Sequence, residues 1–129
     1  MTKYEFEHIH IICNDIEVTK NWYIDKMGAE VTFEAVFKGN QVYYLRLGGV
    51  YIVLIDKQFP GETPEPSSIR HRRGLDHFGL LVKDLEKALG ELKALGVHVI
   101  QDITHVREGL KISYIEAPDN VRIEISERS

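Results

Sequence analysis

Two stretches of the sequence decide the fold: Phe6-Glu7-His8-Ile9-His10-Ile11-Ile12-Cys13, which leads to Asp15, and Leu75-Asp76-His77-Phe78-Gly79-Leu80-Leu81-Val82, which leads to Asp84. Each is a short, largely apolar run that predicts a strand. In each, the aspartate that follows is a favoured N-cap residue for a helix. A glycine then ends each predicted helix, Gly28 in the first case and Gly96 in the second. The same strand-and-helix pattern therefore occurs twice.

The spacing within the two halves agrees closely. A histidine precedes the capping aspartate by seven residues in both, as His8 to Asp15 and His77 to Asp84. Three more strands are expected after each helix, at about 30–36, 41–47 and 50–56, and again at about 97–103, 111–116 and 121–126. The repeat predicts an α+β fold in which two βαβββ modules form a curved, mixed, mostly antiparallel sheet around a pocket.

The segment between the halves differs in kind, because three of its seven residues from Pro60 to Pro66 are prolines. Proline lacks a backbone N–H, so a regular element is not expected there. A chain of 129 residues fits one domain. We therefore expect a single domain over 1–129, with one module at about 1–57, a linker at 58–73 and a second module at about 74–129.

Composition excludes several classes of function. The formal net charge of −4 argues against nucleic acid as the main partner, because phosphate binding needs a basic surface. No apolar run is long enough to span a membrane, and the first residues do not resemble a signal peptide. The one cysteine, Cys13, cannot form an intrachain disulfide. A cytoplasmic protein with a small-molecule partner is the expectation.

The repeat also indicates where chemistry could occur. Equivalent positions in the two halves pair His8 with His77, and Val53 with Glu124. Side chains alternate along a strand, so His8, His77 and Glu124 are predicted on the faces that do not cover helices. Two imidazoles and a carboxylate suit one divalent metal ion of the first transition row, Fe, Mn, Ni, Co or Zn. The alternative is a pair of hydrogen-bonded core histidines and a surface glutamate.

At these residues the sequence resembles the vicinal oxygen chelate superfamily, which contains glyoxalases, extradiol dioxygenases, fosfomycin-resistance transferases and bleomycin-binding proteins. The resemblance rests on three groups of stretches, namely Glu7–Asp15 with Trp22-Tyr23 and Met27-Gly28, Leu75–Phe78 with Asp84–Glu86, and Ala117–Glu124. It implies metal positions at His8, Val53, His77 and Glu124. Because Val53 is not a ligand, the chain departs from the glyoxalase pattern, in which a glutamate there is both ligand and base.

The resemblance implies an enzyme in which a small molecule with vicinal oxygens chelates the metal. Lyase or isomerase chemistry through a metal-stabilised enolate is the leading expectation, with His10 or Glu116 as the general base. The alternatives are an Fe(II) extradiol-type ring-cleaving dioxygenase, a fosfomycin-type transferase and a non-catalytic drug-binding resistance protein. We also expect a homodimer, whose pocket forms either within one chain or between His8 of one chain and His77 and Glu124 of the other.

Overall fold

The computed structural model describes residues 1–56 and 63–129. The chain divides into two compact units, Met1–Pro66 and Ser67–Ser129, close to the two predicted modules. The part of the predicted linker at 58–62 lies outside the described residues, and residues 63–73 contain neither helix nor strand, as expected. That the two modules form a single domain stays a prediction, so each unit is described by itself below.

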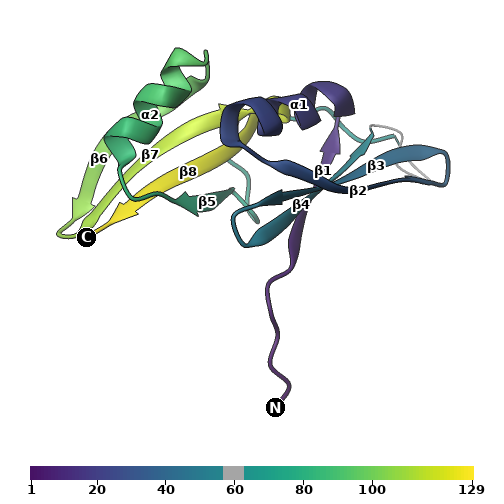
Figure 1. The fold of residues 1–129 in the computed structure, drawn as a ribbon, viewed down its shortest axis with the longest axis horizontal. Helices are drawn as coiled ribbons and strands as arrows, with labels where there is room; N and C mark the ends of the chain where they lie inside the picture. The colour runs from purple at the N-terminus through teal and green to yellow at the C-terminus, as the bar shows by residue number, and fades with distance from the viewer. Residues whose placement is uncertain (57–62) are drawn as a thin grey trace. The chain divides into compact units, whose positions relative to one another are not determined.

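The first unit contains one helix and four strands in the order β1 (His8–Cys13), α1 (Ile16–Met27), β2 (Glu30–Phe37), β3 (Asn40–Leu47) and β4 (Val50–Asp56) (Figure 1). Its sheet has the order β1-β4-β3-β2. The pair β1–β4 is parallel, and the other two pairs are antiparallel. A strand that pairs parallel to its partner needs a long crossover, and α1 with the β2–β3 hairpin supplies it.

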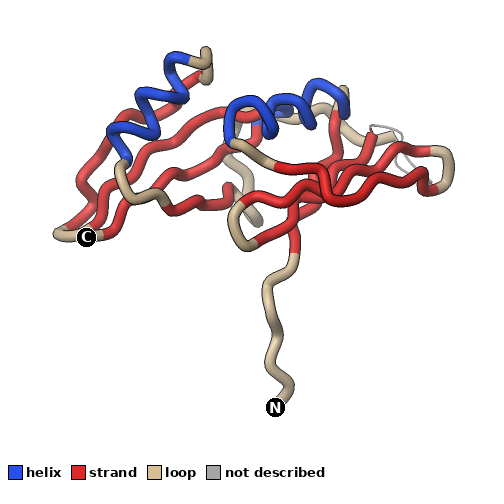
Figure 2. Tube along the Cα trace, in the orientation of Figure 1, coloured by secondary structure: helices blue, strands red, loops and turns tan. Residues whose placement is uncertain are grey.

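The second unit repeats this arrangement with β5 (His77–Leu81), α2 (Leu85–Ala94), β6 (His98–Arg107), β7 (Leu110–Ala117) and β8 (Val121–Arg128) (Figure 2). A short 3-10 turn at Pro118–Asn120 joins the last two strands. The sheet order is β5-β8-β7-β6, again with one parallel pair and two antiparallel pairs. Over the described residues the fold is thus two βαβββ modules with mixed, mostly antiparallel sheets, which confirms the predicted class.

Both helices begin at the aspartates that the sequence indicates. The Asp15 carboxylate accepts a hydrogen bond from the Val18 amide at 3.2 Å, and the Asp84 carboxylate accepts one from the Lys87 amide at 3.1 Å. Gly28 ends α1 in the left-handed conformation, with φ of 72°. A residue with a Cβ is disfavoured in that conformation, which is why glycine stops the helix there.

Each helix covers one face of its own sheet: α1 packs on β3 and β4, and α2 packs on β6, β7 and β8. The side chains of the strands alternate, so every second residue enters the layer below the helix. In α1 the inward residues are Ile16, Thr19 and Tyr23. Met27, the last helical residue, is partly buried. The core residues below the helices include Tyr23, Leu45 and Leu54 in the first unit and Leu85, Leu89, Ile115, Ile123 and Ile125 in the second.

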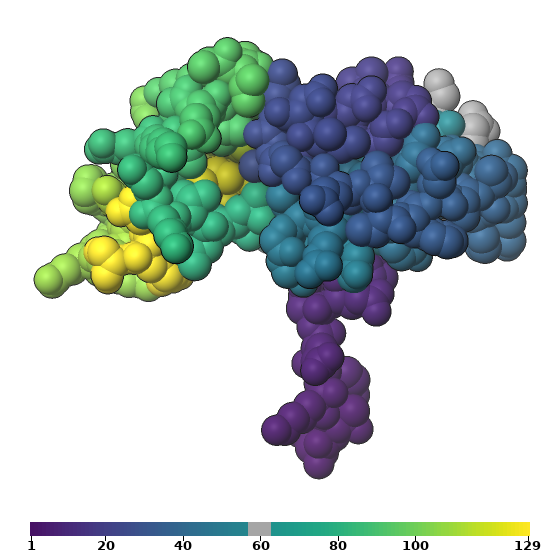
Figure 3. Space-filling view, in the orientation of Figure 1, coloured from purple at the N-terminus to yellow at the C-terminus, as the bar shows by residue number. Residues whose placement is uncertain are grey.

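The first strand of each unit is shorter than predicted. Pairing begins at His8 opposite Tyr51 and at His77 opposite Arg122, because the partner strands begin only one residue earlier. The Glu7 carbonyl still accepts a hydrogen bond from the Tyr51 amide at 3.1 Å, but Phe6 and Leu75 are 73% and 88% exposed. The N-terminal residues project from the first unit as an extended arm (purple in Figure 3). Among the described residues, no helix has both the length and the apolarity needed to cross a membrane.

Candidate metal centre

His77 and Glu124 meet on the sheet face opposite α2. His77 is the first residue of β5, and Glu124 lies within the neighbouring strand β8, where it pairs with Gly79. Gly79 has no side chain beside Glu124, where a Cβ would lie 4.0 Å from the Glu124 Cβ, and the His77 imidazole reaches the carboxylate from two residues earlier on β5. The His77 Nε2 atom lies 2.9 Å from Glu124 Oε2.

Glu124 is held by two further side chains of its own sheet. The Tyr114 hydroxyl donates to Oε2 at 3.1 Å from the directly opposite position on β7. The Ser126 hydroxyl donates to Oε1 at 2.8 Å from two residues along β8. Burial by itself raises the pKa of Glu124, but hydrogen bonds from Ser126 and Tyr114, together with the contact to His77, outweigh it and hold that pKa below its usual value. Burial and then the bond to Glu124 raise the pKa of Tyr114. The carboxylate is thus fixed and ionised.

The other ring nitrogen of His77 contacts a second carboxylate. His77 Nδ1 lies 2.9 Å from Asp76 Oδ2. The other oxygen of Asp76 accepts from His71 Nδ1 at 2.9 Å and lies 3.4 Å from the Arg122 guanidinium. Hydrogen bonds from His77 and His71 lower the pKa of Asp76 to about 2. Asp76 is therefore a carboxylate anchored between three cationic or polar groups.

This arrangement fits a cation at His77 and Glu124. A carboxylate only accepts hydrogen bonds, and a neutral imidazole carries a single N–H, so His77 cannot donate to Asp76 and Glu124 at once. The contact at Nε2 needs either a second proton or a metal ion in its place. The 2.9 Å between Nε2 and Oε2 is an ordinary hydrogen-bond distance, and it places two ligand-type atoms next to each other. The donor set thus suits two neighbouring ligands of one divalent metal.

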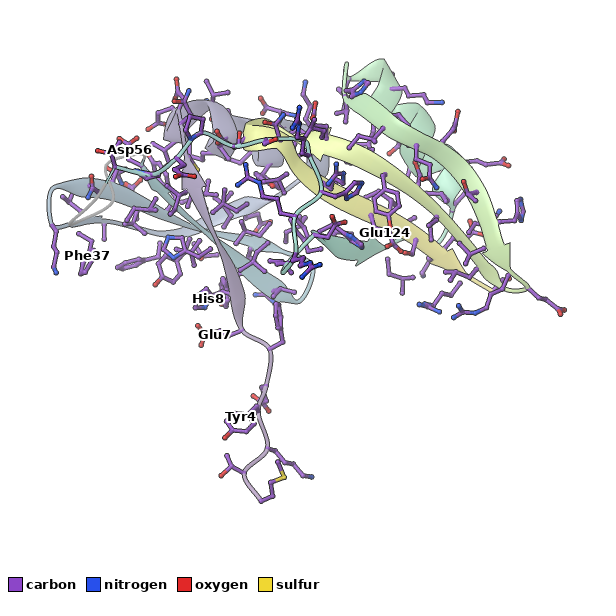
Figure 4. The ribbon with its side chains drawn as sticks, turned by 180° about the vertical axis from the view of Figure 1, so that it is seen from behind. Tyr4, Glu7, His8, Phe37, Asp56 and Glu124 are labelled. Atoms are coloured by element: carbon purple, nitrogen blue, oxygen red, sulfur yellow. The ribbon has the colours of Figure 1, made fainter. Side chains whose placement is uncertain are left out.

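The first unit presents His8 in the same local arrangement. His8 is the first residue of β1, and its Nδ1 lies 2.9 Å from Glu7 Oε1 (Figure 4). His10 follows on the same strand face, and desolvation together with the neighbouring His8 lowers its pKa. His10 pairs with Val53, which packs with Val42 and Ile55. No ligand-type side chain therefore stands at position 53.

The two sheets have the same register, so the equivalence of Val53 with Glu124 holds. Val53 pairs with His10 on one side and Tyr44 on the other. Glu124 pairs with Gly79 on one side and Tyr114 on the other. The predicted match between Val50–Val53 and Val121–Glu124 is thus correct at the level of strand pairing.

Glu116 lies on β7 two residues beyond Tyr114, and so on the same sheet face as Glu124. It is opposite Arg122, and its Oε2 accepts a hydrogen bond from the Asn120 amide group at 3.2 Å. Asn120 holds a positive φ of 57° in the turn before β8, a conformation that asparagine tolerates better than most residues. Glu116 is therefore on the ligand face, where its carboxylate is bound by Asn120.

Of the predicted ligands, the structure brings His77 and Glu124 together in the second unit and places His8 in the first. Within residues 1–56 and 63–129, no cluster of three or more His, Cys, Asp or Glu side chains that could hold a metal was found. The triad of His8, His77 and Glu124 therefore stays a prediction. Sequence reasoning missed Asp76 and Ser126. The signals were present: an acid precedes both histidines, and Ser126 shares the face of Glu124 by strand alternation.

Comparisons with known proteins agree with this fold. The model of the Glyoxalase/Bleomycin resistance protein/Dioxygenase superfamily matches residues 5–125. The uncharacterized protein YwkD of Bacillus subtilis (strain 168) is 31% identical over 123 residues, which cover 94% of each chain. A glyoxalase family protein from Enterococcus faecalis has a similar structure, with a TM-score of 0.79, 26% identity and coverage of 95% of this chain and 97% of that one.

A variant of the fosfomycin resistance protein FosX from Listeria monocytogenes, in complex with Mn(II) and 1S,2S-dihydroxypropylphosphonic acid, shares the fold. Its TM-score is 0.74 at 18% identity, with coverage of 99% of this chain and 95% of that one. The repeated module, its strand register and the match of the family model along nearly the whole sequence lead to one conclusion. The chain belongs to the glyoxalase/bleomycin resistance protein/dioxygenase superfamily.

Proposed function

We propose that the protein is a divalent-metal-dependent enzyme in which His8, His77 and Glu124 hold one metal ion. The substrate would be a small molecule with oxygens on neighbouring atoms, which can bind the metal through both. Lyase or isomerase chemistry is the leading reaction class. Membership of the superfamily supports an enzyme of this class, and the side chains around Glu124 support the binding of a metal ion.

The observation that carries the proposal is the imidazole of His77 between two carboxylates. Asp76 Oδ2 lies 2.9 Å from the Nδ1 atom of this ring, and Glu124 Oε2 lies 2.9 Å from its Nε2 atom. Tyr114 and Ser126 already donate to the Glu124 carboxylate, which holds its orientation. Asp76 already contacts Arg122 and His71, so a cation held by His77 and Glu124 would mainly offset the charge of the Glu124 carboxylate.

When bound, the metal would supply Lewis-acid stabilisation of an enolate or similar oxyanion. The chain itself must move the proton, and the absence of a carboxylate at Val53 leaves that task to other groups. His10 and Glu116 are the proposed acid and base, because each lies on the ligand face of its sheet. His10 is two residues from His8, and Glu116 is two residues from Tyr114.

A second candidate reaction is the addition of water or a thiol to an epoxide. It is favoured by the structural similarity to FosX, which was solved with Mn(II) and a dihydroxypropylphosphonic acid. The same three-ligand set would serve, because a metal can activate an epoxide oxygen as it does a carbonyl.

Metal content and reactivity test the proposal together. Protein purified without added metal should contain about one divalent ion per chain by elemental analysis, and the variants H8A, H77A and E124A should contain less. The metal-free protein would then be loaded with Fe(II), Mn(II), Ni(II), Co(II) or Zn(II) and assayed on α-hydroxycarbonyl compounds, catechols and epoxides. Wild-type protein that neither contains nor binds any of these ions would overturn the proposal. Turnover of catechol with iron alone would assign the dioxygenase reaction instead.

A further inference from the structure

Both candidate ligand histidines follow an acidic residue, and in both units that acid contacts the same ring nitrogen. Glu7 Oε1 lies 2.9 Å from His8 Nδ1, and Asp76 Oδ2 lies 2.9 Å from His77 Nδ1. The two units share little sequence at these positions beyond the acid and the histidine. Two copies of one contact, built with side chains of different length, indicate a common task.

The position of each pair in its strand makes the contact possible. Adjacent side chains within a strand point to opposite faces, so an acid inside the strand would face away from the next residue. His8 and His77 are each the first residue of a strand, and Glu7 and Asp76 precede it. Although the Glu7 carbonyl accepts from the Tyr51 amide, each acid lies outside the regular strand, and its carboxylate turns towards the following ring.

The contact determines which nitrogen can bind a metal. A carboxylate accepts hydrogen bonds only, so Nδ1 must carry the proton. In a neutral imidazole the lone pair is then on Nε2, which faces away from the acid. His77 Nε2 is the atom that lies 2.9 Å from Glu124. Hydrogen bonds of this kind are what set the tautomer and ring orientation of metal-binding histidines.

We propose that Glu7 and Asp76 are positioning residues that keep Nδ1 of His8 and His77 protonated, so that Nε2 of each ring is the metal-binding atom. This inference rests on the proposed function, and neither acid touches the metal or the substrate in it. The two acids are not equal. Asp76 is held in turn by His71 and Arg122, whereas the Glu7 side chain is 75% exposed. A fixed carboxylate orients its partner more effectively than a mobile one, since less side-chain entropy is lost on contact.

Zinc affinity is the first measurement, made by calorimetry on the full chain with Zn²⁺ alone as the probe. D76A should weaken zinc binding roughly 10- to 100-fold, the usual cost of losing such a partner, and E7A should weaken it less. D76N and E7Q keep an oxygen that can accept from Nδ1–H, so they should restore much of the affinity. Asp102 and Glu5 provide matched controls, because D102A and E5A remove the same charge from the same units at other sites. Thermal unfolding shows that each variant is folded.

The second measurement is the ¹⁵N chemical shift of the imidazole nitrogens, which distinguishes Nδ1–H from Nε2–H. In the metal-free protein, at a pH where the rings are neutral by the same spectra, His8 should be protonated at Nδ1, and E7A should shift it towards Nε2–H. In the zinc form both rings should bind through Nε2. Unchanged tautomers and unchanged affinity in E7A and D76A would overturn the inference. If the wild type binds neither zinc nor any of the other divalent ions tested above, the proposed function fails, and the metal-free spectra still decide the role of the acids.

Discussion

At the residue scale, Glu124 is the side chain on which most contacts converge. One oxygen accepts from Ser126, and the other accepts from Tyr114 and lies next to His77. A carboxylate with several donors keeps one orientation and stays ionised, as its lowered pKa indicates. Both properties favour binding of a divalent cation over binding of a proton.

The hydroxyl of Tyr114 offers a mild test of this network. Y114F removes one donor from Glu124 without changing the shape of the side chain, so we expect zinc affinity to fall several-fold. The pKa of Glu124 should move up, and the pH at which zinc binding is half-complete should rise with it, because protons then compete better for the carboxylate. Stability should fall by about 1 kcal/mol, the typical net value of a hydrogen bond.

Tyr44 is the matched control for that variant. It occupies the equivalent position in the first unit, opposite Val53, where there is no carboxylate. Y44F should leave zinc affinity unchanged in calorimetry. Equal losses in Y44F and Y114F would show that the tyrosine hydroxyls act on the fold in general and not on Glu124.

Val53 is the other residue whose replacement tests the reading of the repeat. Its position is equivalent to that of Glu124, and the resemblance of the sequence to the superfamily implies a metal ligand there. V53E should add a fourth ligand and increase zinc affinity, measured by calorimetry. Because Val53 is only 4% exposed, the metal-free variant should lose roughly 1–3 kcal/mol of stability from burying a polar group. V42E, in the same apolar cluster, should lose similar stability and gain no affinity.

At the element scale, a polar contact ties α1 to β3. The Tyr43 hydroxyl donates to Glu17 Oε1 at 2.5 Å, and Lys20 Nζ lies 2.6 Å from Glu17 Oε2. The bonds from Lys20 and then Tyr43 lower the pKa of Glu17, and the bond to Glu17 is the main reason that the pKa of Tyr43 is raised. The helix is thus fixed to the sheet by charge as well as by apolar packing.

The pH dependence of this contact follows from the direction of the Glu17 shift. A carboxyl whose pKa is lower in the folded state stabilises the fold above its unfolded pKa, and that contribution is lost as the pH falls through the folded pKa. Y43F should therefore lower the free energy of unfolding by about 1 kcal/mol at neutral pH. The difference in unfolding free energy between Y43F and the wild type should shrink below about pH 4. Urea unfolding at several pH values measures this. Y51F, on the opposite sheet face, should show no such convergence.

At the scale of the whole molecule, the sheet of each unit has two edge strands, β1 and β2 in one and β5 and β6 in the other. Open edges are normally covered, paired or protected by charge. We predict a homodimer, for which light scattering at micromolar concentration should report twice the monomer mass of 14.9 kDa. A mass equal to the monomer would contradict it.

Subunit exchange would show how a dimer builds its sites. H8A and E124A each lack one predicted ligand, and both should bind zinc poorly when separate. We expect zinc binding to return after mixing, because a pocket shared between chains gives the heterodimer one site with both lesions and one site with none. If each pocket lies within a single chain, every site keeps a lesion and no zinc binding returns.

The sequence by itself determined the features that depend on local chemistry. Asp15 and Asp84 begin helices because a carboxylate can accept from the first-turn amides, and Gly28 ends one because it tolerates positive φ. The βαβββ repeat, the helix-free faces of His77 and Glu124, and the equivalence of Val53 with Glu124 follow from residue spacing. All of these depend on neighbours a few residues apart or on an internal repeat.

The tertiary structure decided which side chains meet around Glu124. Glu124 is 47 residues from His77 and 10 from Tyr114, and only the register of β5, β8 and β7 brings the three together. The position of Gly79 beside Glu124 and the turn of the Asp76 carboxylate towards His77 likewise depend on where the strands begin and which residues pair. A side chain's partner across a sheet is set by the packing of the whole module, because a shift of one residue in register would send each ligand to the opposite face.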